Sequence, residues 1–147
     1  MKLIDLPPTW LVAFLAAGWL QAQMLPVVGF GAWADVVGTA LVVLGFALMG
    51  LAAVEFLRHR TTIVPRQDAS ALVASGIFRF TRNPIYLGDL MLLVGFGLRW
   101  DSILCLILAP VFVRIITSRF IFDEEAHLAG KFGVAFEDYR AQVRRWI

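Results

Sequence analysis

Long apolar runs and short charged segments alternate along the chain. Apolar residues dominate four stretches, at roughly 9–30, 34–57, 84–99 and 102–121. A helix needs about 20 apolar residues to cross the hydrocarbon core of a bilayer, and the third stretch is slightly shorter than that. The pattern therefore predicts an all-α integral membrane bundle with about four transmembrane helices.

Residues at the ends of these stretches indicate where the helices begin, end and bend. Thr9 and Ser102 are candidate N-caps. Pro84 suits the first turn of a helix, where a missing N–H does no harm. Pro26 is expected to end or bend the first helix, and Pro110 is expected to kink the fourth.

The segment from Phe122 to Ile147 has a different pattern, which predicts an amphipathic helix rather than a membrane span. Its apolar residues recur at spacings of three or four, so they share one helical face. These residues are Leu128, Phe132, Phe136, Tyr139 and Val143. Gly130 and Gly133 weaken the helix and suggest a break. We expect the segment to lie at the membrane interface or to fold back over the bundle.

Composition and charge agree with a membrane protein. Sixty percent of the residues are hydrophobic and only 16% are charged, against about a quarter charged in a soluble domain. The net charge of +2 is small, and the basic residues form no continuous tract, so we expect no nucleic-acid partner.

The length allows one domain, 1–147. The only cysteine, Cys105, lies within an apolar run and cannot form an intramolecular disulfide. No metal site is expected.

The basic residues fall on alternate connections. The connection between the second and third apolar stretches contains Arg58, Arg60, Arg66, Arg79 and Arg82. The tail contains Lys131, Arg140, Arg144 and Arg145. The first connection has no Lys or Arg, and the third has only Arg99. The positive-inside rule therefore predicts a multi-pass protein of a plasma or bacterial inner membrane, with both termini in the cytoplasm.

Two ionisable residues lie inside apolar stretches, where they are costly. Asp89 lies about two turns into the third predicted helix, and Arg114 lies seven residues before the end of the fourth. Such residues usually face a partner or a polar cavity. Three interpretations remain open: a structural ion pair at similar depth, an arginine that snorkels to the membrane surface, or a pair that lines a polar pocket open to the cytoplasm.

The segment 75–88 is rich in residues that a plain connector does not need. A glycine, two arginines and the Asn83-Pro84 step directly precede a helix. The exposed amides and the positive end of the dipole at such a helix start favour an anionic group such as a carboxylate. Tyr86 and Gly88 add an aromatic wall and a point of close approach. Alternatively, the arginines only set the topology.

Two further motifs can be interpreted as either structural or functional. Gly95 and Gly97 form a GxG, which in a membrane helix is most often a packing feature. Asp123, Glu124 and Glu125 follow the fourth apolar stretch. These acids could cap the next helix, or they could meet a cationic ligand or the hydroxyls of a ribose.

Taken together, two segments resemble the isoprenylcysteine carboxyl methyltransferase family of membrane methyltransferases, with a more distant similarity to the phospholipid N-methyltransferases. The first matching segment supplies Gly76, Phe78, Arg79, Phe80, Arg82, Asn83, Pro84, Tyr86 and Gly88. The second supplies Glu125, Leu128, Phe132, Gly133, Phe136, Tyr139, Val143 and Arg145. The order is the expected one and the match covers about the C-terminal half. Ile77 and Asn83 depart from the family, since proline and histidine are common there, and an asparagine cannot act as a base.

The resemblance implies S-adenosylmethionine as the methyl donor, bound between the membrane helices and the folded-back C-terminal segment. It makes 70–147 the cofactor-binding and catalytic half and leaves 1–58 as scaffold helices. The cofactor-binding residues by resemblance are Arg82, Asn83, Tyr86, Leu87, Gly88, Glu124, Glu125 and Tyr139, with Gly95 and Gly97 as counterparts of the GxG in the phospholipid enzymes. Arg145 and Glu125 are the candidate catalytic residues, with Arg145 near the acceptor or the cofactor carboxylate.

The expected reaction is methyl transfer to a lipophilic small molecule or lipidated substrate that enters from the bilayer lipids. A carboxylate acceptor is ionised at neutral pH and needs no base, and the motif residues offer no convincing base, so a carboxylate is favoured. Two alternatives remain open, an NADPH-dependent membrane reductase of related helical fold and a non-enzymatic membrane assembly protein. The sequence does not indicate an oligomeric state.

Overall fold

The computed structural model describes residues 6–26, 29–61 and 70–147, and every regular element among them is a helix. Four helices form the main bundle: α1 (Pro7–Met24), α2 (Ala32–Arg58), α3 (Pro84–Arg99) and α4 (Ile103–Ile116). The shorter elements are η1 (Gly76–Arg79), η2 (Thr117–Ile121), α5 (Phe122–Phe132) and α6 (Val134–Gln142). The all-α prediction is therefore confirmed for the described residues, and α2 and α3 lie close to their predicted ranges.

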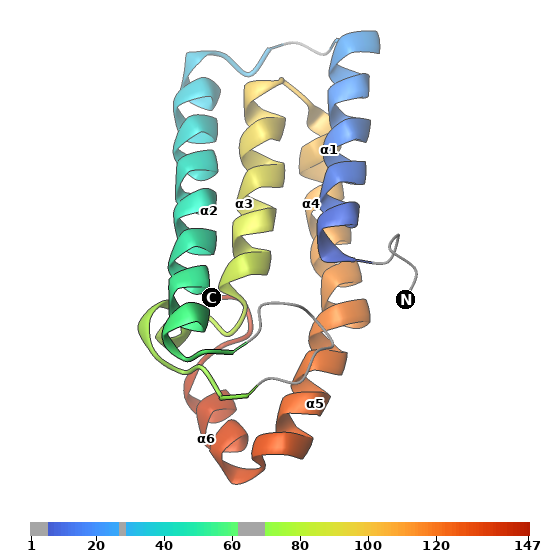
Figure 1. Cartoon of the computed structure of the whole chain (residues 1–147). Coiled ribbons are helices and arrows are strands. Elements are labelled where there is room, and N and C mark those ends of the chain that lie inside the picture. Colours follow the sequence, from blue (N-terminus) through green and yellow to red (C-terminus); the bar gives the residue numbers. More distant parts are fainter. Residues whose placement is uncertain (1–5, 27–28, 62–69) are drawn as a thin grey trace.

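The four long helices run alternately in opposite directions, with α3 in the middle (Figure 1). The extensive contacts join α3 to α1, α2 and α4, and join α1 to α4. Helices α1 and α2 lie on either side of α3 (Figure 1). The start of α1, the end of α2, the start of α3 and helix α6 lie at one end of the bundle, which we call the connector end (Figure 1).

Glycines bring α2 and α3 into close backbone contact. A Cβ atom added at Gly38 would lie 2.7 Å from the carbonyl oxygen of Gly95, and one added at Gly45 would lie 2.9 Å from that of Gly88. Small residues at matching positions are what allows two membrane helices to approach closely. The two glycine pairs therefore fix α3 against α2. They also fix the segment 70–83 that leads into α3, which we call the connector.

The fourth apolar helix is longer than expected. Helices α4, η2 and α5 follow one another without a break from 103 to 132, through a π-helical turn at η2. The expected end near 121 is wrong, because the residues there have no glycine or proline to stop the helix. Asp123, Glu124 and Glu125 lie in the first turn of α5, but none of them caps it, because its N-cap is Ile121 and no side chain makes a capping hydrogen bond.

The predicted break in the C-terminal segment is confirmed at Gly133. This residue has a φ of +52°, in a region that side chains with a Cβ rarely adopt. Helix α6 starts directly after it and turns back toward the bundle (Figure 1). The C-terminal segment is therefore two short helices rather than one.

Of the predicted helix ends, Pro84 and Ser102 are confirmed. Pro84 opens α3, and the Ser102 hydroxyl accepts a hydrogen bond from the amide of Cys105 at 3.4 Å. Thr9 is not a cap, because the helix already begins at Pro7 after an N-cap at Leu6. The helix ends at Met24 with Leu25 as its C-cap, directly before Pro26, so the prediction that Pro26 ends it is confirmed, although the stretch was expected to reach about residue 30.

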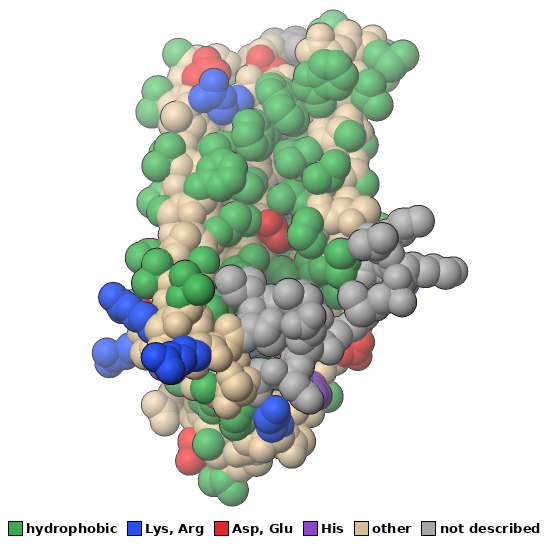
Figure 2. All heavy atoms as spheres, in the orientation of Figure 1, with side chains coloured by type: hydrophobic (Ala, Val, Ile, Leu, Met, Phe, Trp, Pro, Cys, Tyr) green, Lys and Arg blue, Asp and Glu red, His purple; other side chains and the backbone are tan. Residues whose placement is uncertain are grey.

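Among the described residues, two helices are by length and composition apolar enough to cross a membrane: α2, and the continuous helix from 103 to 132. Large apolar side chains are exposed along α2, namely Trp33, Val36, Val37, Val43, Leu44, Phe46, Leu51, Val54 and Leu57. Figure 2 shows hydrophobic side chains over the body of the bundle and most Lys and Arg side chains near the connector end. An apolar surface of this kind fits a lipid environment rather than water.

Candidate functional site

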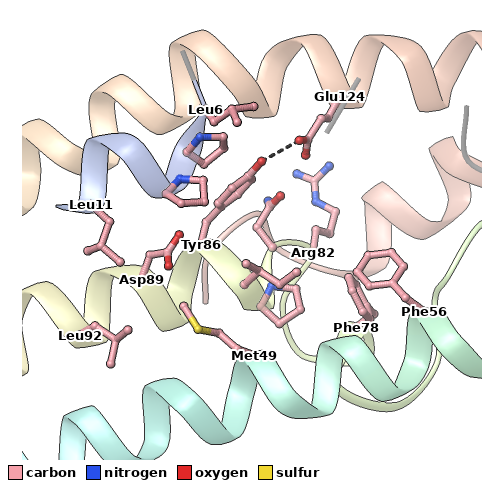
Figure 3. Close-up of a pocket in the computed structure, with 15 residues that line it drawn as sticks. Leu6, Leu11, Met49, Phe56, Phe78, Arg82, Tyr86, Asp89, Leu92 and Glu124 are labelled. Carbon is pink, nitrogen blue, oxygen red and sulfur yellow. Dashed lines mark hydrogen bonds between the residues drawn. The ribbon is translucent and has the colours of Figure 1, made fainter. Parts of the chain in front are cut away.

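A cavity of about 600 Å³ lies at the connector end, between the bundle helices and α5. Its walls come from α1, α2, η1 and α3, and from one residue of α5 (Figure 3). The lining residues are Leu6, Pro7, Pro8, Leu11, Met49, Phe56, Phe78, Arg82, Asn83, Pro84, Ile85, Tyr86, Asp89, Leu92 and Glu124. Its size is typical of small-molecule sites, which occupy roughly 300–1,000 Å³.

The polar lining residues gather near the start of α3. Tyr86, in the first turn of that helix, donates a hydrogen bond from its hydroxyl to Glu124 Oε1 at 2.6 Å (Figure 3). Arg82 and Asn83 come from the connector just before the helix. One wall of the cavity can therefore offer a cation, an amide, a phenol and a carboxylate to a ligand.

Arg82 is a mostly buried cation in the wall of the cavity. Its side chain is only 10% exposed, and Nη1 lies 3.2 Å from Glu125 Oε1. The alignment does not make this contact a hydrogen bond, so the buried Nε and Nη1 have no hydrogen-bond acceptor among the described residues. Burial lowers the pKa of Arg82 from its usual value, and the Glu125 carboxylate opposes that shift. The guanidinium stays charged at neutral pH, and because Arg82 lines the cavity its charge can attract an anionic group there.

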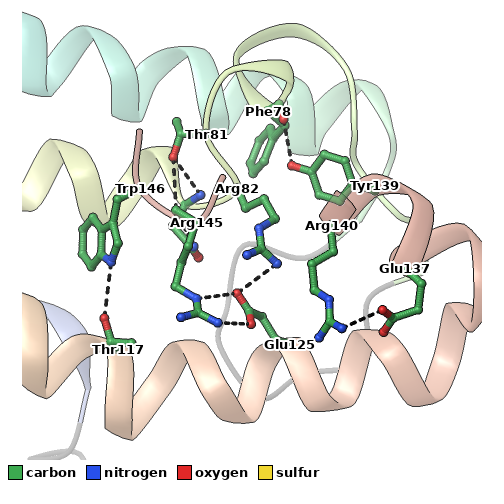
Figure 4. A network of polar contacts seen from close by, with 11 residues as sticks. Phe78, Thr81, Arg82, Thr117, Glu125, Glu137, Tyr139, Arg140, Arg145 and Trp146 are labelled. Atoms are coloured by element: carbon green, nitrogen blue, oxygen red, sulfur yellow. Dashed lines mark hydrogen bonds and ion pairs between the residues drawn. The ribbon is translucent and has the colours of Figure 1, made fainter. Parts of the chain in front are cut away.

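Glu125 lies behind this wall and binds two arginines (Figure 4). Arg145 donates to it twice, from Nε at 2.9 Å and from Nη2 at 2.7 Å. This pairing raises the pKa of Arg145. The Arg145 guanidinium also lies 5.0 Å from the centre of the Phe122 ring. Glu125 therefore holds the last residues of the chain and does not line the cavity.

Further hydrogen bonds attach the C-terminal tail to the connector. The amide of Arg82 donates to the carbonyl of Arg144 at 3.0 Å, and Asn83 Nδ2 donates to the carbonyl of Arg145 at 2.9 Å. The tail thus fixes the backbone at Arg82 and the side chain of Asn83, which both line the cavity.

Tyr139 and Trp146 anchor the same segment at its two ends (Figure 4). The Tyr139 hydroxyl donates to the carbonyl of Phe78 at 2.7 Å, and burial raises the pKa of this phenol. Trp146 Nε1 donates to Thr117 Oγ1 at 3.3 Å. Both residues support the site from outside the cavity.

The structure divides the predicted site residues into three groups. Arg82, Asn83, Tyr86 and Glu124 line the cavity. Glu125, Tyr139 and Arg145 form the polar network behind it. The remaining predicted residues lie outside the cavity lining: Leu87, Gly88, Gly95 and Gly97.

The glycines of the third group have packing contacts instead. A Cβ added at Gly88 or Gly95 would each lie 2.8 Å from a carbonyl oxygen of α2, and one at Gly97 would lie 2.5 Å from Cys105 Cβ. Their assignment to the cofactor stays a prediction that the position of the cavity does not support.

Asp89 and Arg114 do not pair. Asp89 is 4% exposed and faces the cavity (Figure 3), whereas Arg114 is exposed on α4. No ion pair or hydrogen bond joins them in the part of the chain that the structure describes. The ion-pair interpretation is therefore wrong, and the polar-pocket interpretation fits Asp89 but not Arg114, whose exposure agrees with a snorkelling side chain.

Sequence reasoning missed the contribution of the first two helices. Leu11 of α1 and Met49 and Phe56 of α2 line the cavity, although the N-terminal half carries no motif and was expected to be scaffold. Only their apolar character is visible in the sequence, and it does not distinguish a cavity wall from a packed or lipid-facing position. Among the described residues there is no group of three or more His, Cys, Asp or Glu that could hold a metal ion.

The site and the bundle define a helical membrane protein with a small-molecule cavity at one end. The profile of the phospholipid methyltransferase family matches residues 33–135, which is more than half of the chain. The chain therefore belongs to this family of integral membrane methyltransferases, which includes relatives of the isoprenylcysteine carboxyl methyltransferases. The comparison with individual curated proteins gave no significant match. The matched region contains every polar residue of the cavity but ends before Tyr139 and Arg145.

Proposed function

We propose that the protein transfers a methyl group from S-adenosylmethionine to a lipophilic acceptor at the cytoplasmic face of the membrane. Membership of the family implies a membrane methyltransferase. The observation that carries the choice of cofactor is Arg82, a guanidinium that lines the cavity and shares its nearest carboxylate, Glu125, with Arg145. A carboxylate is the natural partner for such a guanidinium.

The other lining residues suit the remaining groups of this cofactor. Glu124 can accept hydrogen bonds from an ammonium group or from ribose hydroxyls, and Asn83 can donate or accept them. Phe56 and Phe78 pack edge to face, with 5.2 Å between ring centres, and both line the cavity. An adenine can pack against these rings. The polar network behind the wall would hold Arg82 and Asn83 in place.

The cofactor supplies a reactive methyl group on a sulfonium, and the protein supplies alignment and a dry site. Apolar residues form most of the lining, which excludes water from the region where the acceptor would lie. Orientation is the main contribution that such a site can make to an in-line displacement.

We further propose that all four bundle helices cross the membrane, with the connector end in the cytoplasm. The arginine pattern supports this orientation, because Arg99 lies at the opposite end from most other basic residues. An acceptor would enter from the bilayer between α1 and α2, which flank α3 and both line the cavity (Figure 1). The cofactor would enter from the cytoplasm.

The sequence favoured a carboxylate acceptor because the motif residues offer no base. Asp89 weakens that argument, since it places a carboxyl group in the cavity outside both motifs. A reductase that uses NADPH has no specific observation in its favour, because the cavity offers one arginine to a ligand that carries several phosphates.

Calorimetric titration of the purified protein in detergent tests the proposal. S-adenosylmethionine should bind, NADPH should not, and Arg82→Gln should weaken the affinity about tenfold or more, as expected for a lost charged hydrogen bond. Arg79→Gln is the matched control, because Arg79 is exposed and lies outside the cavity lining. Binding of NADPH in place of S-adenosylmethionine would overturn the proposal. If S-adenosylmethionine binds as expected, labelled methyl transfer into a membrane extract, followed by mass spectrometry, identifies the product.

A further inference from the structure

Asp89 is a buried acidic side chain in the otherwise apolar inner part of the cavity. It is 4% exposed and points into the cavity among Leu11, Met49 and Leu92 (Figure 3). Neither a hydrogen bond nor an ion pair to any described residue satisfies it. The packing and hydrogen bonds within the chain thus give no reason for an acid at this position.

An unpartnered acid in such a place is costly. Burying a charged or polar group without a partner loses its hydration and gains nothing in return. An ionisable residue inside a membrane helix is for this reason a functional candidate. A ligand that brings a hydrogen-bond donor or a positive charge to Asp89 would recover this cost, whereas a ligand that brings a second carboxylate would add to it.

The position of Asp89 relative to Tyr86 places it on the acceptor side of the site. The two residues are three apart on α3, so they share a face and Asp89 lies about 4.5 Å further along the helix axis. Tyr86 contacts Glu124 at the polar wall, where we place the cofactor. Asp89 lies beyond it, toward the apolar walls that suit a hydrocarbon chain.

We propose, on the basis of the function proposed above, that Asp89 binds the head of the acceptor, and that the reacting atom of the acceptor is an amine or hydroxyl that carries a proton rather than a carboxylate. The apolar chain of the acceptor lies along Leu11, Met49 and Leu92. Asp89 accepts the hydrogen bond that orients the head group toward the cofactor.

This arrangement also gives the proton of the acceptor a destination. The nitrogen or oxygen of the acceptor forms a bond to the methyl carbon, and the carbon–sulfur bond of the donor breaks with its electron pair staying on sulfur. The proton that the acceptor releases passes to the Asp89 carboxylate and from there to water. No oxidant, metal or further reactant is required.

Binding of matched amphiphiles tests this proposal separately from catalysis. Hexadecylamine, hexadecanol, palmitate and hexadecyl methyl ether share one chain and differ in the head group. Each is titrated by calorimetry into the protein in a neutral detergent, with and without S-adenosylhomocysteine. The wild type should bind the amine and the alcohol about tenfold more tightly than the ether or palmitate, the gain expected from a hydrogen bond to a charged group.

Three variants define the role of the carboxylate. Asp89→Asn should abolish the preference for the amine over palmitate, while Asp89→Glu should retain most of it. Asp138→Asn is the matched control, because Asp138 is exposed on α6 and is not among the residues that line the cavity. The affinity for S-adenosylhomocysteine should be the same in all four proteins, which also shows that the variants are folded.

The outcomes separate this proposal from the proposed function. An equal preference in the wild type and in Asp89→Asn, tighter binding of palmitate by the wild type, or no binding of any amphiphile would each overturn the role of Asp89. A wild type that binds no cofactor but prefers the amine through Asp89 would overturn the methyltransferase assignment and keep the Asp89 site.

Discussion

Arg145 binds Glu125 through two hydrogen bonds, from Nε to Oε1 at 2.9 Å and from Nη2 to Oε2 at 2.7 Å. Glu125 lies on the long helix that continues from α4, and Arg145 lies near the end of the chain (Figure 4). Since Arg82 also lies 3.2 Å from Glu125, one carboxylate connects the C-terminal tail, α5 and the connector that lines the cavity.

Removing the charge of Glu125 should therefore destabilise the connector end. Glu125→Gln leaves two neighbouring arginines without their shared anion, and we expect a loss of about 1–3 kcal/mol in the free energy of unfolding. Thermal unfolding in detergent measures this loss. The control is Glu137→Gln, because the Glu137–Arg140 ion pair is about half exposed and should cost less than about 0.5 kcal/mol. Equal effects of the two substitutions would contradict a central role for Glu125.

Arg82→Lys should weaken cofactor binding although it preserves the positive charge. A lysine offers one compact ammonium instead of a planar fork of donors, so it cannot bind a carboxylate in two places. We expect about a tenfold loss of affinity for S-adenosylmethionine, measured by calorimetry, which corresponds to one charge-assisted hydrogen bond. Wild-type affinity in this variant would mean that Arg82 acts only through its charge.

Tyr86→Phe should reduce cofactor affinity with little effect on the fold. The substitution removes the hydroxyl that donates to Glu124 at 2.6 Å but keeps the buried ring. Glu124 then loses one of the contacts that orient it, and we expect a three- to tenfold weaker affinity, equal to about 1 kcal/mol. Unchanged binding of S-adenosylmethionine by this variant would remove Glu124 from the proposed cofactor site.

The raised pKa of Tyr139 predicts a loss of stability at high pH. Burial disfavours the phenolate in the folded protein, so the pKa of Tyr139 is higher in the folded than in the unfolded state. The contribution of Tyr139 to the free energy of unfolding is then complete below the ordinary tyrosine pKa of about 10. It decreases as the pH rises above that value. Unfolding by denaturant at pH 8 and above pH 10 measures the loss. Tyr139→Phe should lower stability at pH 8 but show a smaller further loss, and an unaltered pH profile would contradict this.

The sequence predicted the elements whose signals are local. Helices α2 and α3 follow from apolar runs, the break at Gly133 follows from a glycine, and Arg82, Asn83 and Tyr86 follow from the motif. These features depend on residues close together in the chain, so composition and spacing are enough to find them.

Local signals could not predict which residues face the cavity and which lie behind its wall. Glu124 and Glu125 are adjacent in sequence, yet one lines the cavity and the other is held by two arginines. Which of two neighbouring acids faces inward depends on the rotation of the continuous helix through η2, which no local signal specifies. Asp89 was recognised as unusual, but its lack of a partner becomes visible only when the neighbouring helices are in place.

Glycine substitutions distinguish a packing role from a cofactor role on α3. Gly95→Ala would place a Cβ 2.8 Å from the carbonyl oxygen of Gly38, a distance that forces α2 and α3 apart. We expect a loss of about 1–3 kcal/mol in the absence of cofactor, the usual cost of overpacking. Gly50→Ala is the control, because no atom lies within 4 Å of the added Cβ and alanine favours the helix by up to about 1 kcal/mol. Thermal unfolding without ligand measures both. If Gly95→Ala were as stable as the wild type and lost only its affinity for S-adenosylmethionine, Gly95 would belong to the cofactor site after all.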